Sequence, residues 1–248
     1  MLGCAPQIDS PYTDDPRTSI RDYNLKNILK LDPNKPLRFA IISDSHQNYA
    51  DLGSTIKIIN EKNVSFVLNT GDFTNIGSNT EYDQFIEQVQ SLTPPIISTI
   101  GNHDTVGKGV DLFRKIFGPD NYFFDHQSFR FIIFNNNYLD MGSIDLPWLD
   151  SAINTSPFPV IIMQHIPVSE ADYFPGEIKG QVDISYQNPK IFLVLNGHKH
   201  GFDDQMTYHY LTHQTARTEG SQYSILTISE GSIYVENCVA SNCSSAQY

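Results

Sequence analysis

The sequence is short of positive charge. It carries 16 lysine and arginine residues against 28 aspartate and glutamate residues, a formal net charge of −12. Binding to a nucleic-acid polymer usually requires a basic stripe that neutralises phosphates, and no run of basic residues occurs here. The composition therefore argues against a nucleic-acid polymer as partner. If the protein handles a phosphate group, a metal ion is the obvious source of the missing positive charge.

Long apolar runs are missing as well. No stretch approaches the roughly 18 consecutive apolar residues that a membrane-spanning helix needs. The chain has 248 residues, 40% of them hydrophobic, which fits one sizeable globular domain. The sequence leaves the oligomeric state open.

Cysteine is also scarce, with three residues in the whole chain. Cys238 and Cys243 lie five positions apart, and no second pair exists to complete a zinc ribbon. Two readings stay open for this pair. It forms a small-loop disulfide, which would indicate an oxidising compartment, or the two thiols are unpaired.

The third cysteine, Cys4, stands in the start MLGC, which resembles a bacterial lipoprotein signal without its charged region and most of its apolar region. Residues 5–36 are rich in Pro, Asp, Ser and Thr, a composition that fits a surface tether, which could include a short helix over residues 21–31. We therefore expect a tether over residues 1–36 and a single domain over residues 37–248. The expected location is the periplasm or cell surface of a bacterium, through a lipid on Cys4, with the cytoplasm as the alternative.

From residue 37 onwards, short apolar runs alternate with segments of helical periodicity. The spacing of apolar residues predicts helices over residues 51–63, 78–92, 110–118 and 145–153. Ser78 and Glu81 have the spacing of a capping box. The last part of the chain alternates like antiparallel strands. Periodicity alone thus indicates alternating strands and helices, followed by strands.

Five apolar runs end in side chains that can bind metal ions: Asp44 with His46, Asp72, Asn102 with His103, His165, and His198 with His200. Ligands in open α/β sheets gather at the carboxyl ends of strands, so we expect these groups to meet. Imidazole nitrogen with carboxylate and amide oxygen suits Zn, Mn, Fe or Ni. Without His103, seven groups remain, too many for one such ion with open positions but suitable for two that share a carboxylate.

The motifs DSH, GD, GNHD, H and GHKH, in that order, resemble the pattern of the calcineurin-like metallophosphoesterases. GDFTNIGSNTEYDQF and PPIISTIGNHD further resemble the phosphodiesterase-like branch of that superfamily. The resemblance runs from about residue 37 to about residue 201. It implies an α/β fold in which two mixed β-sheets pack face to face between helices, in four layers (αββα).

The resemblance also implies the site. Two metal ions, whether Mn, Fe or Zn, would share a hydroxide that attacks small phosphodiesters or phosphomonoesters, with diesters favoured. The residues implied are Asp44, His46 and His200 for one ion, Asn102, His165 and His198 for the other, and Asp72 as the bridge.

His103 is left free of the metals and is the candidate proton donor to the leaving group. We expect Asp104 to accept a hydrogen bond from its imidazole, and Gly101 to allow a sharp turn before it. Asn102 and His103 would also contact the substrate, whereas Lys199 either touches a substrate phosphate or points to solvent. Asn75 departs from the branch, which often has an acid at that position.

A different class of function is a non-catalytic binding protein at the cell surface, built on the same fold. Such proteins typically lose metal ligands, and this chain keeps the full set. Metal content after purification discriminates between the two hypotheses.

Overall fold

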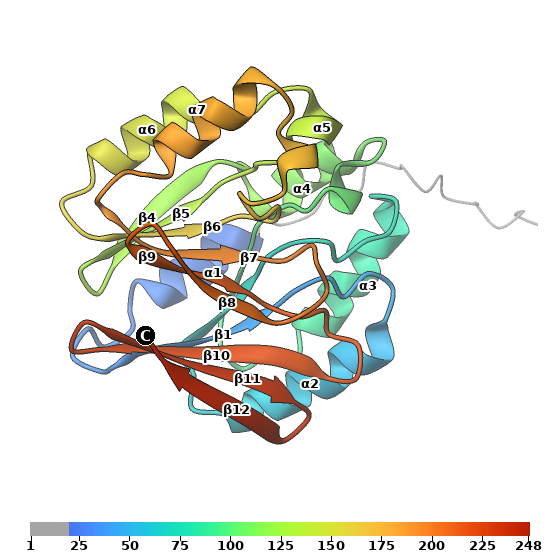
Figure 1. The fold of residues 1–248 in the computed structure, drawn as a ribbon. Coiled ribbons are helices and arrows are strands. Elements are labelled where there is room, and N and C mark those ends of the chain that lie inside the picture. Colours follow the sequence, from blue (N-terminus) through green and yellow to red (C-terminus); the bar gives the residue numbers. More distant parts are fainter. Residues whose placement is uncertain (1–19) are drawn as a thin grey trace, which may run out of the picture.

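The computed structural model describes residues 20–248. Two six-stranded sheets face each other, with helices on the outer face of each (Figure 1). The predicted four-layer αββα sandwich is confirmed. The lipoprotein-like start with Cys4 lies outside the described residues.

The first sheet has the strand order β12-β11-β10-β1-β2-β3, and the second has the order β4-β5-β6-β7-β9-β8. Strands β1, β2 and β3 are parallel, and β10, β11 and β12 continue that sheet in antiparallel fashion. In the second sheet β5, β6, β7 and β9 are parallel, with β4 and β8 antiparallel at the edges. The strands are β1 (Leu37–Ile42), β2 (Phe66–Asn69), β3 (Ile96–Ser98), β4 (Tyr122–His126), β5 (Phe129–Ile133), β6 (Val160–Met163), β7 (Ile191–Asn196), β8 (Asp203–Thr207), β9 (Tyr210–Gln214), β10 (Gln222–Ser229), β11 (Ser232–Val239) and β12 (Asn242–Gln247).

Helices α2 and α3 lie on the first sheet, and α6 and α7 cover the second (Figure 1). Two short 3₁₀ turns occur in loops, at His103–Thr105 and Ala171–Tyr173. The α-helices are α1 (Ile20–Ile28), α2 (Tyr49–Glu61), α3 (Asn79–Val89), α4 (Gly109–Phe117), α5 (Tyr138–Met141), α6 (Leu146–Asn154) and α7 (Glu177–Ser185).

Three apolar clusters hold these layers together. The central one lies between the sheets, where the rings of Phe39 and Phe66 stack with centroids 5.3 Å apart and Phe131 meets them edge-on. The other two clusters pack helices α2, α3 and α4 on the first sheet and helices α6 and α7 on the second. Because the central strands are buried on both faces, they read as continuous apolar runs. Their carboxyl ends lie at one edge of the sandwich.

Part of the predicted tether belongs to the domain. Ile28, at the end of α1, is fully buried in the central cluster, and Leu25 and Leu31 pack against the same cluster. The prediction of a tether over residues 1–36 is therefore wrong for residues 20–36. The polar composition of this segment hides an apolar stripe, because Leu25, Ile28 and Leu31 recur every three residues.

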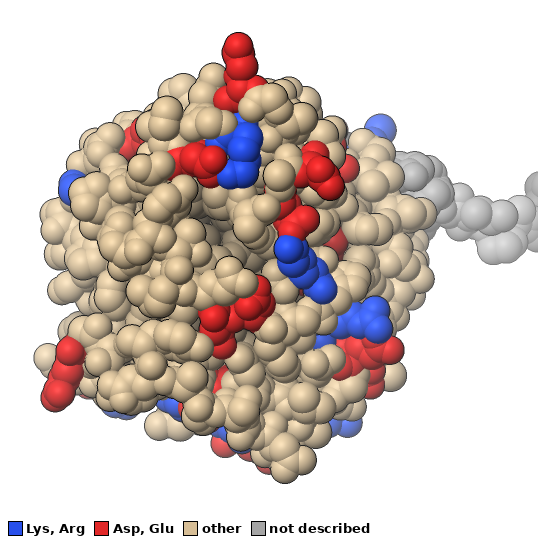
Figure 2. Space-filling model, viewed as in Figure 1, with Lys and Arg blue, Asp and Glu red and all other residues tan. Residues whose placement is uncertain are grey.

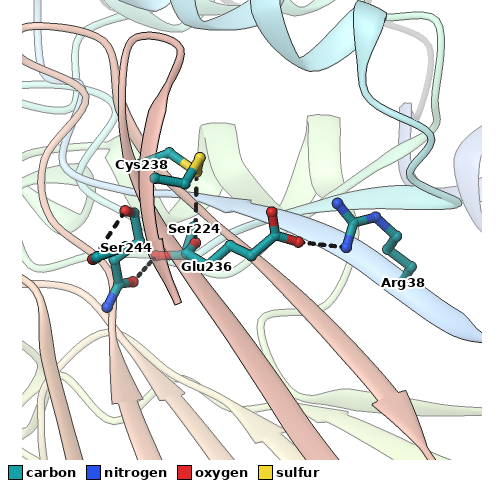
Figure 3. The surroundings of a disulfide bond; sticks show 7 residues. Arg38, Ser224, Glu236, Cys238 and Ser244 are labelled. Carbon is teal, nitrogen blue, oxygen red and sulfur yellow. Dashed lines mark hydrogen bonds and ion pairs between the residues drawn. A yellow bond between two sulfur atoms is a disulfide. The ribbon is translucent and has the colours of Figure 1, made fainter. Parts of the chain in front are cut away.

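Cys238 on β11 and Cys243 on the neighbouring β12 form a disulfide. Close by, the Glu236 carboxylate forms an ion pair with the guanidinium of Arg38 on β1, with Oε1 and Nη1 2.6 Å apart (Figure 3). The disulfide joins β11 to β12, and the ion pair joins β11 to β1. Within residues 20–248, no helix combines the length and apolarity needed to cross a membrane.

Candidate metal centre

The seven predicted ligands come together at the carboxyl ends of five strands. The ligand atoms of Asp44, His46 and His200 all lie within 4.8 Å of one another, as do those of Asp72, His165 and His198. Asn102 joins the second group, since its Oδ1 lies 3.1 Å from Nε2 of His165. The order of the groups along the strands is Asp44 and His46 after β1, Asp72 after β2, Asn102 after β3, His165 after β6, and His198 and His200 after β7.

The two groups adjoin each other. Oδ1 of Asp44 lies 4.0 Å from Nε2 of His165, so a carboxylate of the first group reaches an imidazole of the second. Desolvation lowers the pKa of His46, while the Asp72 carboxylate acts in the opposite direction, so Asp72 influences the first group as well. Its Oδ2 lies 3.1 Å from Nε2 of His165. These positions form one centre with two halves.

Backbone carbonyls fix two of the imidazole rings. Nδ1 of His165 lies 2.8 Å from the carbonyl oxygen of Thr70, and Nδ1 of His46 lies 3.1 Å from that of Thr74. A carbonyl oxygen only accepts, so in both rings Nδ1 carries the hydrogen. Nε2 then presents its lone pair to the centre, which is how metal-binding histidines are held in proteins.

The interior of the centre is crowded with acceptors. Nε2 of His165 faces Asp72 Oδ2 and Asn102 Oδ1, each at 3.1 Å, and His165 and Asp72 are buried. Desolvation would lower the pKa of His165, but the Asp72 and Asp44 carboxylates outweigh it and raise the pKa to about 9. The raised pKa shows that these residues favour positive charge at this position. Lone pairs that converge on one buried point fit a metal cation.

The surroundings of His198 favour its neutral form. Desolvation, together with the neighbouring His165, lowers the pKa of its imidazole to about 4. The ring of Tyr173, from the loop after β6, meets His198 edge-on with centroids 4.8 Å apart. Metal ions bind neutral imidazole, so this environment favours the ligand form.

The environment of His103 differs from the expected one. Nδ1 of His103 lies 2.8 Å from the backbone carbonyl oxygen of Asn75, and Asp104 does not face the ring. The prediction of an Asp104–His103 side-chain hydrogen bond is therefore wrong. The imidazole of His103 is exposed and lies against that of His46, with ring centroids 4.9 Å apart.

Asp104 instead joins the loop after β2 to the loop after β3. Its fully buried carboxylate accepts four hydrogen bonds of 2.8–2.9 Å, from the N–H groups of Asp72, Thr74 and Gly101 and from the Thr74 hydroxyl. Desolvation and the Asp72 charge raise the pKa of Asp104 to about 8, while the four donors favour the carboxylate. Asp104 thus sets the backbone positions of residues beside the candidate metal centre.

Gly101 serves close packing rather than a left-handed turn. A Cβ at this position would lie 2.2 Å from Oδ1 of Asp72, which no side chain tolerates. The same Oδ1 accepts the N–H of His103 at 2.9 Å. Glycine therefore lets the loop after β3 approach the Asp72 carboxylate.

Lys199 points to a carboxylate of the protein. Its ammonium forms an ion pair with Glu170, in the loop after β6. The sequence predicts that Lys199 either contacts a substrate phosphate or points to solvent. The structure adds a third, a salt bridge at the rim of the centre.

Several supporting residues escaped the sequence analysis. Ser43 donates to Oδ2 of Asp44 and accepts from Thr70 Oγ1 at 2.6 Å, so two hydroxyls orient that carboxylate. Asn136 accepts from the N–H groups of His165 and Ile166 at 3.3 and 3.1 Å. Nothing in the local sequence marks Ser43 or Thr70, whereas the run NNN directly after an apolar stretch was a signal for Asn136.

The chain matches a known protein family and shares its fold with solved structures. A family model described as calcineurin-like phosphoesterase matches residues 37–202. A curated phosphodiesterase of Methanocaldococcus jannaschii is 25% identical over 134 residues, which cover 52% of this chain and 72% of that protein.

Two solved structures share the fold at low sequence identity. A dimetal phosphatase from Danio rerio aligns with a TM-score of 0.63 and 13% identity, covering 85% of this chain and 99% of that one. A purple acid phosphatase from yellow lupin (Lupinus luteus) seeds aligns with a TM-score of 0.68 and 14% identity, covering 86% of this chain and 53% of that one.

Proposed function

The chain belongs to the calcineurin-like phosphoesterase family, and from that premise we propose that it hydrolyses small phosphate esters with the help of two metal ions. The observation that carries the proposal is the convergence of seven oxygen and imidazole ligands on one buried centre that requires positive charge. Phosphodiesters are the favoured class, because the segments around GD and GNHD resemble the phosphodiesterase-like branch and a relative is a phosphodiesterase.

The residues divide between two ions of Mn, Fe or Zn. Bound ions would supply Lewis acidity that neutralises phosphoryl oxygens and activates water, the usual contribution of paired metals to ester cleavage. Lysine and arginine are then not needed to neutralise the phosphate. The proposed division gives Asp44, His46 and His200 to one ion, Asn102, His165 and His198 to the other, and a bridging position to Asp72.

His103 is proposed to move the proton. Its Nδ1 hydrogen is donated to the Asn75 carbonyl, so the ring is held in one orientation and its Nε2 is free to face a substrate. A protonated Nε2 would give its hydrogen to the oxygen of the leaving group. Lys199 is occupied by Glu170, so we assign it no direct role in binding phosphate.

A non-catalytic binding role on this fold has less support. A binding protein would not need to keep seven metal ligands, five of which adopt strained backbone conformations. Metal-free protein after purification from metal-supplemented cells would favour that role.

The direct test is hydrolysis of bis-4-nitrophenyl phosphate and 4-nitrophenyl phosphate by protein reconstituted with Mn²⁺. We expect turnover of both, with the diester preferred in kcat/KM. Absence of turnover for both esters, in protein shown to contain metal, would contradict the proposal. Preference for the monoester would correct the substrate class alone.

The role of His103 is tested by His103→Ala in the same assay. The expected loss in kcat is roughly a hundredfold or more, the range for a general acid, with metal content unchanged. The matched control is His209→Ala, which removes an exposed histidine from the β8–β9 turn. Equal kcat for His103→Ala and the control would remove His103 from the mechanism.

A further inference from the structure

A cavity of about 160 Å³ opens on the outer face of the second sheet, beside the metal centre. It lies over β7, β9 and β8, next to α7, and Figure 2 shows this face hollowed beside that helix. Helices α6 and α7 lie on the outer face of the second sheet (Figure 1), where they pack on residues of β5, β6 and β7 and on Tyr210 of β9.

One buried hydrogen-bond donor in the cavity wall has no acceptor. Asn196, at the end of β7, is fully buried and lines the cavity, yet its Nδ2 has no partner among the described residues. Its orientation is fixed, because Gln164 donates from Nε2 to the Ile166 carbonyl and to Oδ1 of Asn196 at 2.9 Å. An unsatisfied buried N–H is costly, so a ligand acceptor at this position would be bound favourably.

Both lysines at the cavity are paired with carboxylates, and its wall also contains the Asp203 carboxylate. Lys179 forms an ion pair with Asp183 on α7, and Lys199 forms one with Glu170. Both lysines line the cavity, so neither is free to attract an anion there. The cavity therefore suits an uncharged group that accepts and donates hydrogen bonds.

The size and lining of the cavity indicate which uncharged group fits it. A cavity of about 150 Å³ holds one benzene ring, so this one holds a single ring and not a whole nucleotide. The aromatic rings of Tyr208 and Tyr210 lie at its edge, 6.1 Å apart, and Thr212 and Gln214 add polar groups. Aromatic rings with hydroxyl and amide groups are suited to a hydroxylated ring, whose faces are apolar and whose rim is polar.

The cavity and the metal centre share a wall. Asn196 and Lys199 line the cavity, and His198 and His200 of the same loop belong to the centre. We propose that the cavity binds a sugar ring of the alcohol that stays on the phosphorus when a phosphodiester is cleaved. This inference rests on the proposed function and names the substrate class of the same centre.

The test compares two diesters that release the same group. Mn²⁺-loaded protein is given 4-nitrophenyl thymidine 5′-phosphate, which carries a sugar, and methyl 4-nitrophenyl phosphate, which does not. We expect a higher kcat/KM for the thymidine ester. Tyr208→Asn, chosen because Asn tolerates the φ of 55° at this position, should lower kcat/KM for that ester by about tenfold, the loss of one good aromatic contact. The methyl ester should be unaffected.

Two further variants complete the comparison. Asn196→Asp keeps the acceptor for Gln164 but removes the free donor, and should also reduce the preference for the thymidine ester. Tyr234→Asn removes an exposed tyrosine from β11, outside the cavity, and should leave both esters unchanged. Equal kcat/KM for the two esters, or equal losses on both in Tyr208→Asn, would overturn the inference.

A titration with methyl β-D-ribofuranoside separates this inference from the proposed function, because it needs no turnover. We expect amide chemical-shift changes at Thr212 and Gln214 in the wild-type protein and their loss in Tyr208→Asn. If no ester is hydrolysed, the proposed function fails while the titration still decides whether the cavity binds a sugar. Shifts that are absent from the wild-type protein would refute the sugar site.

Discussion

Five of the predicted metal ligands have left-handed backbone conformations, which reduce the stability of the folded chain. The φ angles of the residues concerned are 49° for Asp44, 45° for His46, 54° for Asp72, 77° for His198 and 62° for His200. A residue with a Cβ loses roughly 1–2 kcal/mol in this region. Such strain collects at sites where side chains must point at one place. We therefore expect this strain to lower the free energy of unfolding of the metal-free protein.

This strain predicts an unusual order of stability at His200, whose side chain is 40% exposed. In metal-free protein, His200→Gly should be more stable than His200→Ala by about 1 kcal/mol, because glycine adopts a φ of 62° without strain. Urea unfolding of the two variants measures the difference. At His209, which is exposed and outside this set, alanine should be the more stable residue. An alanine variant at position 200 as stable as the glycine variant would show that the ligand backbone is not strained.

At the scale of elements, helix α3 organises the loop that follows Asp72. Its capping box is present as predicted: Ser78 Oγ accepts from the N–H of Glu81, and Glu81 accepts from that of Ser78 at 3.0 Å. The Glu81 carboxylate also accepts from the N–H groups of Asn75 and Ile76 and from Gln47. One side chain therefore holds the loop whose carbonyl groups orient His46 and His103.

Glu81 gives a pH-dependent prediction. Desolvation would raise its pKa, but hydrogen bonds from Ser78, Asn75 and Gln47 outweigh it and lower the pKa below 4.5. A carboxyl group whose pKa is lower in the folded state than in the unfolded state stabilises the fold at pH values above its unfolded-state pKa. This stabilisation is lost as the pH falls through the folded-state pKa. Glu81→Gln should therefore cost about 1–3 kcal/mol at pH 7, with the difference shrinking below about pH 4.5.

The measurement is urea unfolding of wild type and Glu81→Gln between pH 7 and pH 3.5. Glu87→Gln is the control, since Glu87 lies exposed on the same helix. A constant difference across this range would mean that the Glu81 charge does not support the loop.

The strands that carry the ligands could be predicted because each is a short apolar run that stops at a polar ligand, as at Asp44 and His165. The helices with a clear apolar stripe, such as α2 and α3, were predicted to within a few residues. Helix α7 was missed, since it contains Gly180 and buries only Val182 and Ser185.

Parts of the site could not be predicted, because they depend on backbone atoms and on distant contacts. The carbonyl groups of Thr70 and Asn75 orient imidazoles, and a backbone carbonyl leaves no mark on the sequence. Asp104 stands beside His103 in the chain, yet its carboxylate turns to the opposite side to meet the loop after β2. Adjacency in sequence therefore gave the wrong partner for both residues.

At the scale of the whole molecule, the sandwich depends on an N-terminal helix that closes its central layer. Helix α1 contacts α4 and β3, and Ile28 is fully buried between the sheets. Full burial of one such side chain contributes about 1.5–3 kcal/mol. Helix α1, the first element of the described residues, is thus a structural part of the domain.

Two truncations test this role. A chain that begins at residue 20 keeps the whole of α1 and serves as the reference. A chain that begins at residue 36 loses Leu25, Ile28 and Leu31, and should be less stable by about 3 kcal/mol or more. Equal stability of the two truncated chains would restore the earlier view that residues 20–36 are only a tether.

We propose that ligands from both sheets form one centre for two metal ions. Isothermal titration of the metal-free protein with Mn²⁺ counts them, with Asp72→Ala as the variant and Asp111→Asn, an exposed carboxylate on α4, as the control. We predict two ions per chain for the wild type and the control, and fewer than two for Asp72→Ala. One ion or none in the wild type would contradict the account.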